Sequence, residues 1–328
     1  MSIELKAITK KFGSLVANDS IDLKVARGEI HAILGENGAG KSTLMNIVYG
    51  LAKADSGKIF VEDKEVIINE PADALRYGIG MVHQHFMLIP VFTVAENIAL
   101  GREESRGVFL TLDEVKKKIK ALADEFKFDI DPDALIEDLP VGVQQRVEII
   151  KALIYDAKVL ILDEPTAVLT PQETDELLNI MRTLKKKGTS IIFITHKLRE
   201  VKDVADKITI IRLGKVVGTT SPDTSQEDLA SMMVGRQVDL APNKSEIKPG
   251  RVILDINKLN VANSLGRKII NSLSLQVKAG EILAIAGVQG NGQSELARAI
   301  LNLEDHVEGS IKLDEQEILG LTVQDALR

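Results

Sequence analysis

The chain has 328 residues, of which 48 are acidic and 41 are basic, so its formal net charge is −7. This charge argues against a protein whose main task is to wrap a phosphate backbone, and an aromatic content of 3% without tryptophan argues against a base-stacking platform for single strands. The absence of cysteine excludes disulfides, thiolate metal sites and cysteine nucleophiles, and it fits a reducing compartment. No run of 18 apolar residues occurs, so we expect no membrane-spanning segment.

Short β-branched runs alternate with longer segments of helical periodicity. Continuous apolar runs are typical of strands buried on both faces of a sheet, and they predict strands at 29–34, 80–83, 159–162, 190–195 and 208–212. Apolar residues at helical spacing predict helices at 112–128, 147–155 and 174–186. This alternation predicts an α/β fold with a predominantly parallel sheet. Residues from about 92 to 156 hold helical patterns and almost no strand, which predicts a helical subdomain inserted in the core.

A repeat with a fixed offset of 252 residues determines the expected domain organisation. The segment GEIHAILGENGAGKSTL, which begins at Gly28, matches GEILAIAGVQGNGQSEL, which begins at Gly280, and the same offset joins the two copies of DALR at Asp73 and Asp325. Residues 237–251 lose all periodicity and contain two prolines, so they predict a linker. We therefore expect one complete domain at 1–236 and the N-terminal part of a second, truncated copy at 252–328.

The segment GENGAGKST fits the pattern Gly, any four residues, Gly-Lys-Ser/Thr, and it joins a predicted strand to a predicted helix. Glycines allow successive backbone N–H groups to point at phosphate oxygens, and the N-terminus of the following helix adds its dipole. The lysine can reach the β- and γ-phosphates, and the hydroxyl that follows it can bind Mg²⁺. The residues predicted to bind nucleotide are Gly35, Asn37, Gly38, Ala39, Gly40, Lys41, Ser42 and Thr43.

Two acidic residues follow another buried strand, in the sequence VLILDEP. Because ligands of α/β sheets bind at the carboxyl ends of the strands, Asp163 and Glu164 are expected near the glycine loop. Asp163 is the candidate that holds Mg²⁺, through water, and Glu164 is the candidate that orients or deprotonates an attacking water. The alternative interpretation is an acidic pair that caps the next helix.

Together these residues resemble the ATPase subunits of ATP-binding cassette (ABC) transporters, which have a P-loop NTPase core. The resemblance covers 1–236 and, through the repeat, 252–328, and it implies ATP and Mg²⁺ as cofactors. Gln84, in MVHQHF, matches a glutamine that senses Mg²⁺ and water, and His196, in FITHKL, matches a histidine that touches the γ-phosphate. Phe12 lies where the family stacks an aromatic ring on adenine, unless it is simply a core residue.

The signature segment of this family, Leu-Ser-Gly-Gly-Gln, corresponds to a divergent sequence at the start of a helix: Leu139, Pro140, Val141, Gly142 and Val143. The serine hydroxyl of the usual signature would bind a γ-phosphate, and proline has no such group. A proline in the first turn of a helix is tolerated, so we expect folding to be unaffected. Thr170 occupies the position of an aspartate that is usual in the family.

The second copy also departs from the pattern. Its glycine loop, represented by Gly287, Gly292, Gln293 and Ser294, has glutamine in place of lysine, and Ser264 replaces the aromatic residue. ABC domains pair head to tail, so each ATP lies between the glycine loop of one domain and the signature of the other. The two divergent segments would then share one composite site, which predicts one hydrolytic site and one regulatory or structural site. The 328-residue chain alone is expected to bind Mg-ATP and to hydrolyse it slowly.

Tandem cassettes with a divergent second loop resemble importers of simple sugars and nucleosides, and the sequence of these segments is similar to that of nucleoside importers served by a lipoprotein receptor. This resemblance implies integral-membrane permease subunits, an indirect extracytoplasmic solute-binding protein, no nucleic acid, and a peripheral position at the cytoplasmic face of the membrane. Residues 85–93 would dock the permease or form part of the helical subdomain's own core. The alternatives are a soluble tandem-cassette ATPase acting on ribosomes or nucleic acid, and a regulatory module that binds nucleotide without turnover.

Overall fold

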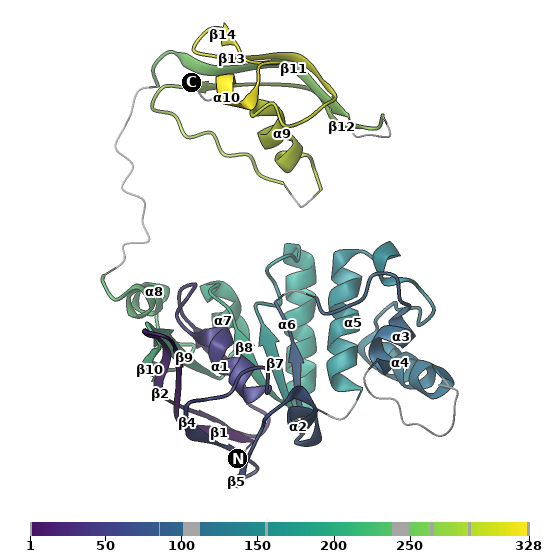
Figure 1. The fold of residues 1–328 in the computed structure, drawn as a ribbon, viewed down its shortest axis with the longest axis vertical. Helices are drawn as coiled ribbons and strands as arrows, with labels where there is room; N and C mark the ends of the chain where they lie inside the picture. The colour runs from purple at the N-terminus through teal and green to yellow at the C-terminus, as the bar shows by residue number, and fades with distance from the viewer. Residues whose placement is uncertain are drawn as a thin grey trace. The chain divides into compact units, whose positions relative to one another are not determined.

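The computed structural model describes residues 2–84, 86–100, 112–154, 157–237, 249–262, 266–287 and 290–326. These residues form two compact units, Met1–Leu240 and Ala241–Arg328, which are described separately (Figure 1). Most of the predicted linker, residues 238–248, lies outside the described residues, as does Ser264. Within the described ranges, no helix is long and apolar enough to cross a membrane.

The first unit is built on a six-stranded sheet in the order β10-β9-β3-β8-β7-β6. Its strands are β3 (Ile30–Leu34), β6 (Ile79–Val82), β7 (Val159–Asp163), β8 (Ser190–Ile194), β9 (Lys207–Arg212) and β10 (Lys215–Thr220). The first five are parallel to one another, and β10 pairs antiparallel with β9. Every residue of β3, β6, β7 and β8 is buried, as continuous apolar runs predict. All five predicted strands and the predominantly parallel α/β fold are confirmed.

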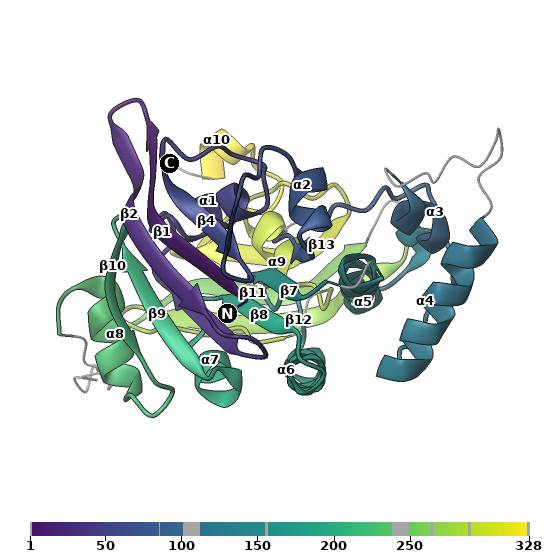
Figure 2. The same ribbon diagram turned by 90° about the horizontal axis from the view of Figure 1, so that it is seen from below.

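One face of this sheet is covered by helices from the second half of the unit. They are α5 (Val141–Leu153), α6 (Pro171–Lys186), α7 (Leu198–Val204) and α8 (Gln226–Val234). Figure 2 shows α6 and α7 side by side beneath β8 and β9. Alternate residues of the strands point to this face of the sheet. Ile30 and Leu34 of β3, for example, share a buried cluster with Leu178 of α6 and Val201 of α7. This packing holds the carboxyl ends of the strands at one edge, where ligands bind in such sheets.

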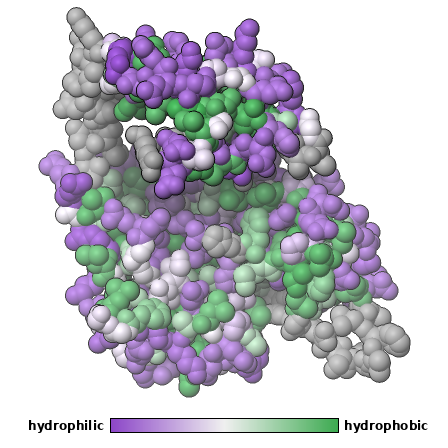
Figure 3. Space-filling view, turned by 45° about the horizontal axis from the view of Figure 1, so that its top comes forward, coloured by the Kyte–Doolittle hydropathy of each residue, from purple (hydrophilic) through white to green (hydrophobic). Residues whose placement is uncertain are grey.

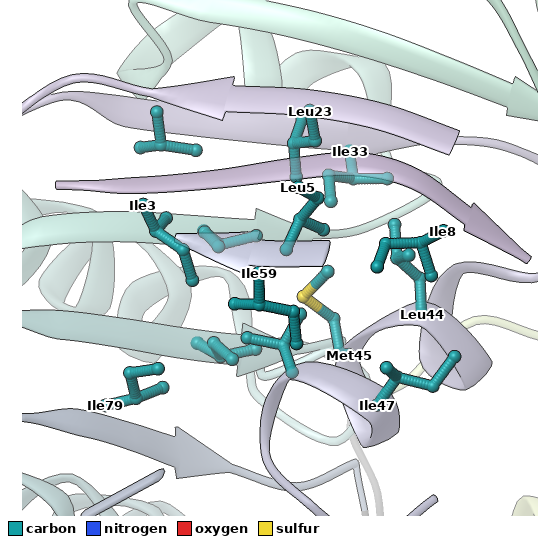
Figure 4. Packing of buried hydrophobic residues seen from close by; sticks show 14 of the residues in the cluster. Ile3, Leu5, Ile8, Leu23, Ile33, Leu44, Met45, Ile47, Ile59 and Ile79 are labelled. Carbon is teal, nitrogen blue, oxygen red and sulfur yellow. The ribbon is translucent and has the colours of Figure 1, made fainter. Parts of the chain in front are cut away.

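The opposite face packs against two short helices and a separate antiparallel sheet. The helices are α1 (Lys41–Val48) and α2 (Pro71–Arg76). The sheet has the order β2-β1-β4-β5, with β1 (Ile3–Phe12), β2 (Leu15–Val25), β4 (Ser56–Val61) and β5 (Lys64–Val66). Figure 4 shows Leu5 and Ile59 of this sheet close to Met45 of α1, in one cluster with Ile33 of β3. The antiparallel sheet was not predicted.

The described parts of 92–156 are helical and have a core of their own. They contain α3 (Val94–Ala99), α4 (Leu112–Phe126), a 3₁₀ turn (Ile136–Asp138) and the whole of α5. Ile98, Ile119, Ile136 and Ile150 share one buried cluster. The helix predicted at 147–155 in fact begins at Val141, because residues 141–146 lack the apolar spacing on which that boundary was based.

The second unit reproduces the antiparallel sheet of the first. Its strands, β11 (Val252–Ala262), β12 (Lys268–Lys278), β13 (Val307–Leu313) and β14 (Gln316–Glu317), have the order β12-β11-β13-β14, which corresponds to β2-β1-β4-β5. The helix α9 (Gln293–Ile300) lies 252 residues after α1 at both of its ends, and α10 (Val323–Ala326) begins 252 residues after α2. The sequence repeat therefore has a structural counterpart.

The segment 281–287 of this unit differs from its counterpart in the first unit. The matching residues of the first unit form β3, which is hydrogen-bonded between β8 and β9, and both of these strands come later in the chain. The described residues of the second unit place no such strands beside 281–287, and the segment forms no strand. Its side chains are exposed: 96% for Ile282, 41% for Leu283 and 53% for Ile285. Apolar side chains are visible at the surface of the upper part of Figure 3.

Candidate nucleotide site

A cavity of about 560 Å³ lies in the first unit beside the glycine loop. Five segments of the chain meet around it: the hairpin of β1 and β2, the loop between β3 and α1, the residues that follow β6 and β7, and the turn between β9 and β10. It is lined by Phe12, Leu15, Val16, Ala17, Asn37, Gly38, Ala39, Gly40, Lys41, Ser42, Thr43, Gln84, Glu164, Leu213 and Gly214. The structure thus brings most of the predicted nucleotide-binding residues together with Phe12, Gln84 and Glu164. Phe12 is exposed rather than part of the core.

The glycine loop leaves β3 at Leu34 and enters α1 at Lys41. Gly40 precedes the helix with φ of 99°, and a Cβ on it would lie 2.2 Å from the carbonyl oxygen of Ala17, so only glycine fits this position. The buried Asn18 of β2 fixes the end of the loop, because its Nδ2 donates a hydrogen bond to the Gly40 carbonyl oxygen at 3.0 Å. Asn18 was not predicted from the sequence, because no local motif marks it.

Lys41 is buried at the first position of α1. Its Nζ donates to the carbonyl oxygens of Gly35 and Glu36, at 2.8 and 2.9 Å. Burial lowers the pKa of Lys41, whereas the nearby carboxylates of Glu164 and Asp163 act in the opposite direction. The ammonium group is therefore held inside the loop, next to the helix N-terminus, where it can bind an anion.

Asp163 ends β7 and is buried beside the first turn of α1. The pKa of Asp163 is raised, mainly because burial penalises the charged carboxylate. The hydrogen bond from the Ser42 side chain and the charge of Lys41 act in the opposite direction, whereas the charge of Glu164 raises the pKa further. Its Oδ1 has no hydrogen-bond partner among the described residues. A buried carboxylate oxygen without a partner, next to a hydroxyl, is a donor set that suits Mg²⁺.

We expect Asp163→Asn to raise the melting temperature of the ligand-free chain by on the order of 5 °C at pH values above the raised pKa of Asp163, because it removes a poorly solvated charge. The folded-state pKa of Asp163 is raised, so ionisation costs stability only above the ordinary aspartate range. The gain should therefore vanish at acidic pH and grow as the pH rises through the raised pKa. Thermal denaturation of both forms across this range is the test. An equal gain at every pH would contradict the prediction.

Glu164 and His196 are brought into contact at the ends of β7 and β8. The His196 Nδ1 lies 3.2 Å from Glu164 Oε1, and the side chains of His196 and Glu164 are 45% and 11% exposed. Glu164 has φ of 46°, in the left-handed region that costs energy for a residue with a side chain. Its backbone N–H donates to the Ile194 carbonyl oxygen at 2.9 Å, which ties the two strand ends together. The strained backbone aims the carboxylate at the cavity that it lines.

The segment Leu139–Val143 lies at the start of α5 and is not part of the cavity lining. Pro140 is the residue that precedes the first helical turn, and it provides no side-chain cap. Thr170 caps α6 through a reciprocal pair of bonds: its Oγ1 accepts from the Glu173 N–H at 3.3 Å, and its own N–H donates to Glu173 Oε2 at 2.9 Å. Threonine and aspartate are both good caps, so this departure preserves the helix start.

The divergent loop of the second unit keeps part of the same geometry. Gly292 precedes α9 with φ of 96°, as Gly40 precedes α1, and Gln293 begins that helix. A Cβ on Gly287 would lie 2.1 Å from Gln293 Nε2, so the amide group lies beside Gly287, the counterpart of the Gly35 whose carbonyl oxygen Lys41 bonds to in the first unit. Ser294 is exposed. An amide in place of the ammonium leaves this loop without its positive charge.

A parallel sheet, a glycine loop between a central strand and a helix, and an acidic pair at the end of a neighbouring strand define a P-loop nucleotide-binding fold. The family model described as "ABC transporter" matches residues 18–167 and 270–327. The chain therefore belongs to the ABC transporter family.

Two curated relatives show how far the similarity extends. The chain is 51% identical, over 96% of its length, to the nucleoside import ATP-binding protein NupA of Lactococcus lactis subsp. cremoris, and 49% identical, over 98%, to the guanosine import ATP-binding protein NupO of Bacillus subtilis. It spans 63% of the length of each of these relatives. Among solved structures, the ADP conformation of MJ1267, an ATP-binding cassette of an ABC transporter, matches with a TM-score of 0.61 and 28% identity, over 71% of this chain and 94% of that one.

Proposed function

We propose that this chain binds and hydrolyses ATP to power solute import through a membrane permease. The observation that carries the proposal is the cavity in which Phe12, Lys41, Gln84 and Glu164 meet. Its exposed aromatic and apolar end suits a purine ring, and its other end combines backbone amides with a buried ammonium group that suits a triphosphate. The adjacent Glu164–His196 pair supplies a proton acceptor where a γ-phosphate would lie.

Within this proposal each group has a separate task. Lys41 exchanges its bonds to the loop carbonyls for bonds to phosphate oxygens, and Glu164 orients the attacking water and accepts its proton. His196 holds the Glu164 carboxylate and contacts the γ-phosphate. Ser42, Gln84 and Asp163 would hold Mg²⁺, directly or through water, and the bound ion would neutralise charge on the phosphates.

We further propose that the two copies of the cassette play different roles. The first carries Lys41, Asp163 and Glu164, and in the second Gln293 takes the place of the lysine. In a head-to-tail pair the divergent segment at Pro140 would face the loop at Gln293, and that composite site would bind or regulate rather than hydrolyse. The 328-residue chain alone would then turn over ATP slowly.

The proposed solute is a nucleoside, which is supported by the names of NupA and NupO, and simple sugars are the alternative. The permease would dock on the segment that follows Gln84, where Met87 and Val91 are 60% and 65% exposed. The buried Asn97 fixes this segment by bonding to Ile89 and to the carbonyl oxygens of Phe92 and Thr93. This arrangement would place the chain at the cytoplasmic face of a membrane, with an extracytoplasmic solute-binding protein as an indirect partner.

The proposal is tested by measuring uptake of labelled guanosine, uridine and ribose in cells that carry the complete transporter, before and after deletion of the gene for this chain. Loss of nucleoside uptake, with ribose uptake unchanged, is expected. Loss of ribose uptake alone would assign the sugar alternative. Normal uptake of all three solutes, together with co-sedimentation of the chain with ribosomes, would contradict the import proposal and favour the soluble alternative.

A further inference from the structure

A cluster of polar side chains lies next to Glu164 and His196 in the sequence, and the proposed mechanism does not use it. We call it the Lys197 brace: Thr166, Thr195, Lys197 and Glu200. Thr166, Thr195 and Glu200 are buried, and the Lys197 side chain is 37% exposed. The first of these residues follows Glu164 by two positions and the other three surround His196, so the brace joins the segments that carry both.

Lys197 is the centre of the brace. Its Nζ donates to the Thr166 carbonyl oxygen at 2.7 Å and to Thr166 Oγ1 at 3.2 Å, and it forms an ion pair with Glu200 Oε1 at 3.3 Å. The backbone N–H of Lys197 donates to Thr195 Oγ1 at 3.1 Å. One side chain therefore binds the backbone after Glu164 and the first turn of α7 at the same time.

Glu200 closes the brace from α7. Its Oε2 accepts hydrogen bonds from Thr166 Oγ1 at 2.8 Å and from Thr195 Oγ1 at 3.4 Å. A buried carboxylate is stable only when it is hydrogen-bonded and paired with a cation, and here two hydroxyls and one ammonium group meet that need. Removal of Lys197 would leave the Glu200 charge with the two hydroxyls alone, and the cluster would rearrange.

The backbone next to this cluster requires support. Glu164 has φ of 46°, and such a conformation persists only where the surrounding structure fixes it. The bond from the Glu164 N–H to the Ile194 carbonyl oxygen fixes the residue itself, and the brace fixes Thr166 on one side and Thr195 on the other. These contacts set the direction of the Glu164 carboxylate and the place of His196.

We propose that Lys197 and Glu200 are positioning residues that hold the segments of Glu164 and His196 at their 3.2 Å separation. This inference rests on the proposed ATP hydrolysis. A shift of the carboxylate by a fraction of an ångström changes turnover far more than nucleotide binding, because Lys41 and the glycine loop lie outside the brace.

The test uses Lys197→Met and Glu200→Gln in the 328-residue chain, and Lys197→Arg as the conservative variant. Lys197→Met and Glu200→Gln are each expected to lower kcat for ATP by on the order of tenfold, with KM within about twofold. Lys197→Arg should retain most of the turnover. The matched control is Arg199→Ala, on the same helix: its exposed ion pair with Asp175 at 3.4 Å lies outside the brace, so kcat should not change.

A second measurement does not depend on turnover. The ring-proton NMR signals of His196, assigned by comparison with His196→Gln, should shift in Lys197→Met and in Glu200→Gln and stay in place in Arg199→Ala. A lower melting temperature with unchanged kcat and unchanged His196 signals would overturn the proposal.

If the wild-type chain hydrolyses no ATP, the proposed function fails and the His196 signals alone test the brace. A shift of these signals supports the positioning role, and unchanged signals overturn it. If Lys197→Met does not fold, Glu200→Gln and Lys197→Arg carry the test.

Discussion

Replacement of Glu164 by glutamine is expected to lower ATP turnover by about 10²–10⁴-fold, the contribution typical of a general base. Glutamine keeps the size of the side chain and can still bond to His196, but it cannot accept the proton of the attacking water. The glycine loop and Lys41 are untouched, so the affinity for ATP should stay within about threefold of wild type. The measurements are steady-state phosphate release and equilibrium binding of a fluorescent ATP analogue, both in the presence of Mg²⁺.

The matched control for this change is Glu176→Gln on α6. Glu176 is an exposed carboxylate that pairs with Arg146 at 2.5 Å and does not line the cavity, so its loss should leave turnover unchanged. Turnover by Glu164→Gln within twofold of wild type would remove Glu164 from the proposed role. A loss of ATP binding in the same variant would point instead to a structural role for the strained residue.

The parallel core could be predicted from the sequence because its strands are buried on both faces. The segments 159–163 and 190–194 are nearly uniform apolar runs, and in a chain that alternates strands with helices such short runs are typical of buried parallel strands. The antiparallel sheet was missed because its strands alternate buried and exposed residues and contain many charges. Strand β1, IELKAITKKF, holds four charged residues in ten, and its pairing with β2 shifts register between Leu5 and Ile8. Its amphipathic pattern is therefore irregular.

In the candidate site, too, some residues could be predicted from the sequence and others could not. Lys41, Asp163 and Glu164 lie in short linear motifs that can be recognised without a fold. The groups that hold them are distant in the sequence: Asn18 lies 22 residues before the glycine whose carbonyl it binds, and Glu200 lies 34 residues after Thr166. Such pairs form only when the sheet brings strand ends together, so no local pattern marks them. The left-handed conformation of Glu164 is likewise a property of the folded chain.

Replacement of Lys41 by alanine is expected to abolish detectable binding of ATP and to lower turnover by at least about 10²-fold. The change removes the ammonium group that the Gly35 and Glu36 carbonyl oxygens hold inside the loop, and with it the positive charge that interacts with the Asp163 and Glu164 carboxylates. The exposed lysine at 58, which pairs with Glu65 at 2.8 Å, provides the control: Lys58→Ala should bind ATP normally. Titration calorimetry with Mg-ATP measures both variants.

The same change also tests the proposed asymmetry of the two copies when it is made in a chain that carries two whole cassettes. If the loop at Gln293 belongs to a site that does not hydrolyse, Gln293→Lys should not restore turnover to Lys41→Ala, because the added ammonium group would enter a composite site whose partner segment contains Pro140. Normal turnover by Lys41→Ala in that two-cassette chain would show that the second copy hydrolyses ATP without a lysine in its loop. That result would reverse the assignment of the two copies while leaving the nucleotide cavity of the first unit intact, so binding and turnover must be measured on the same preparations.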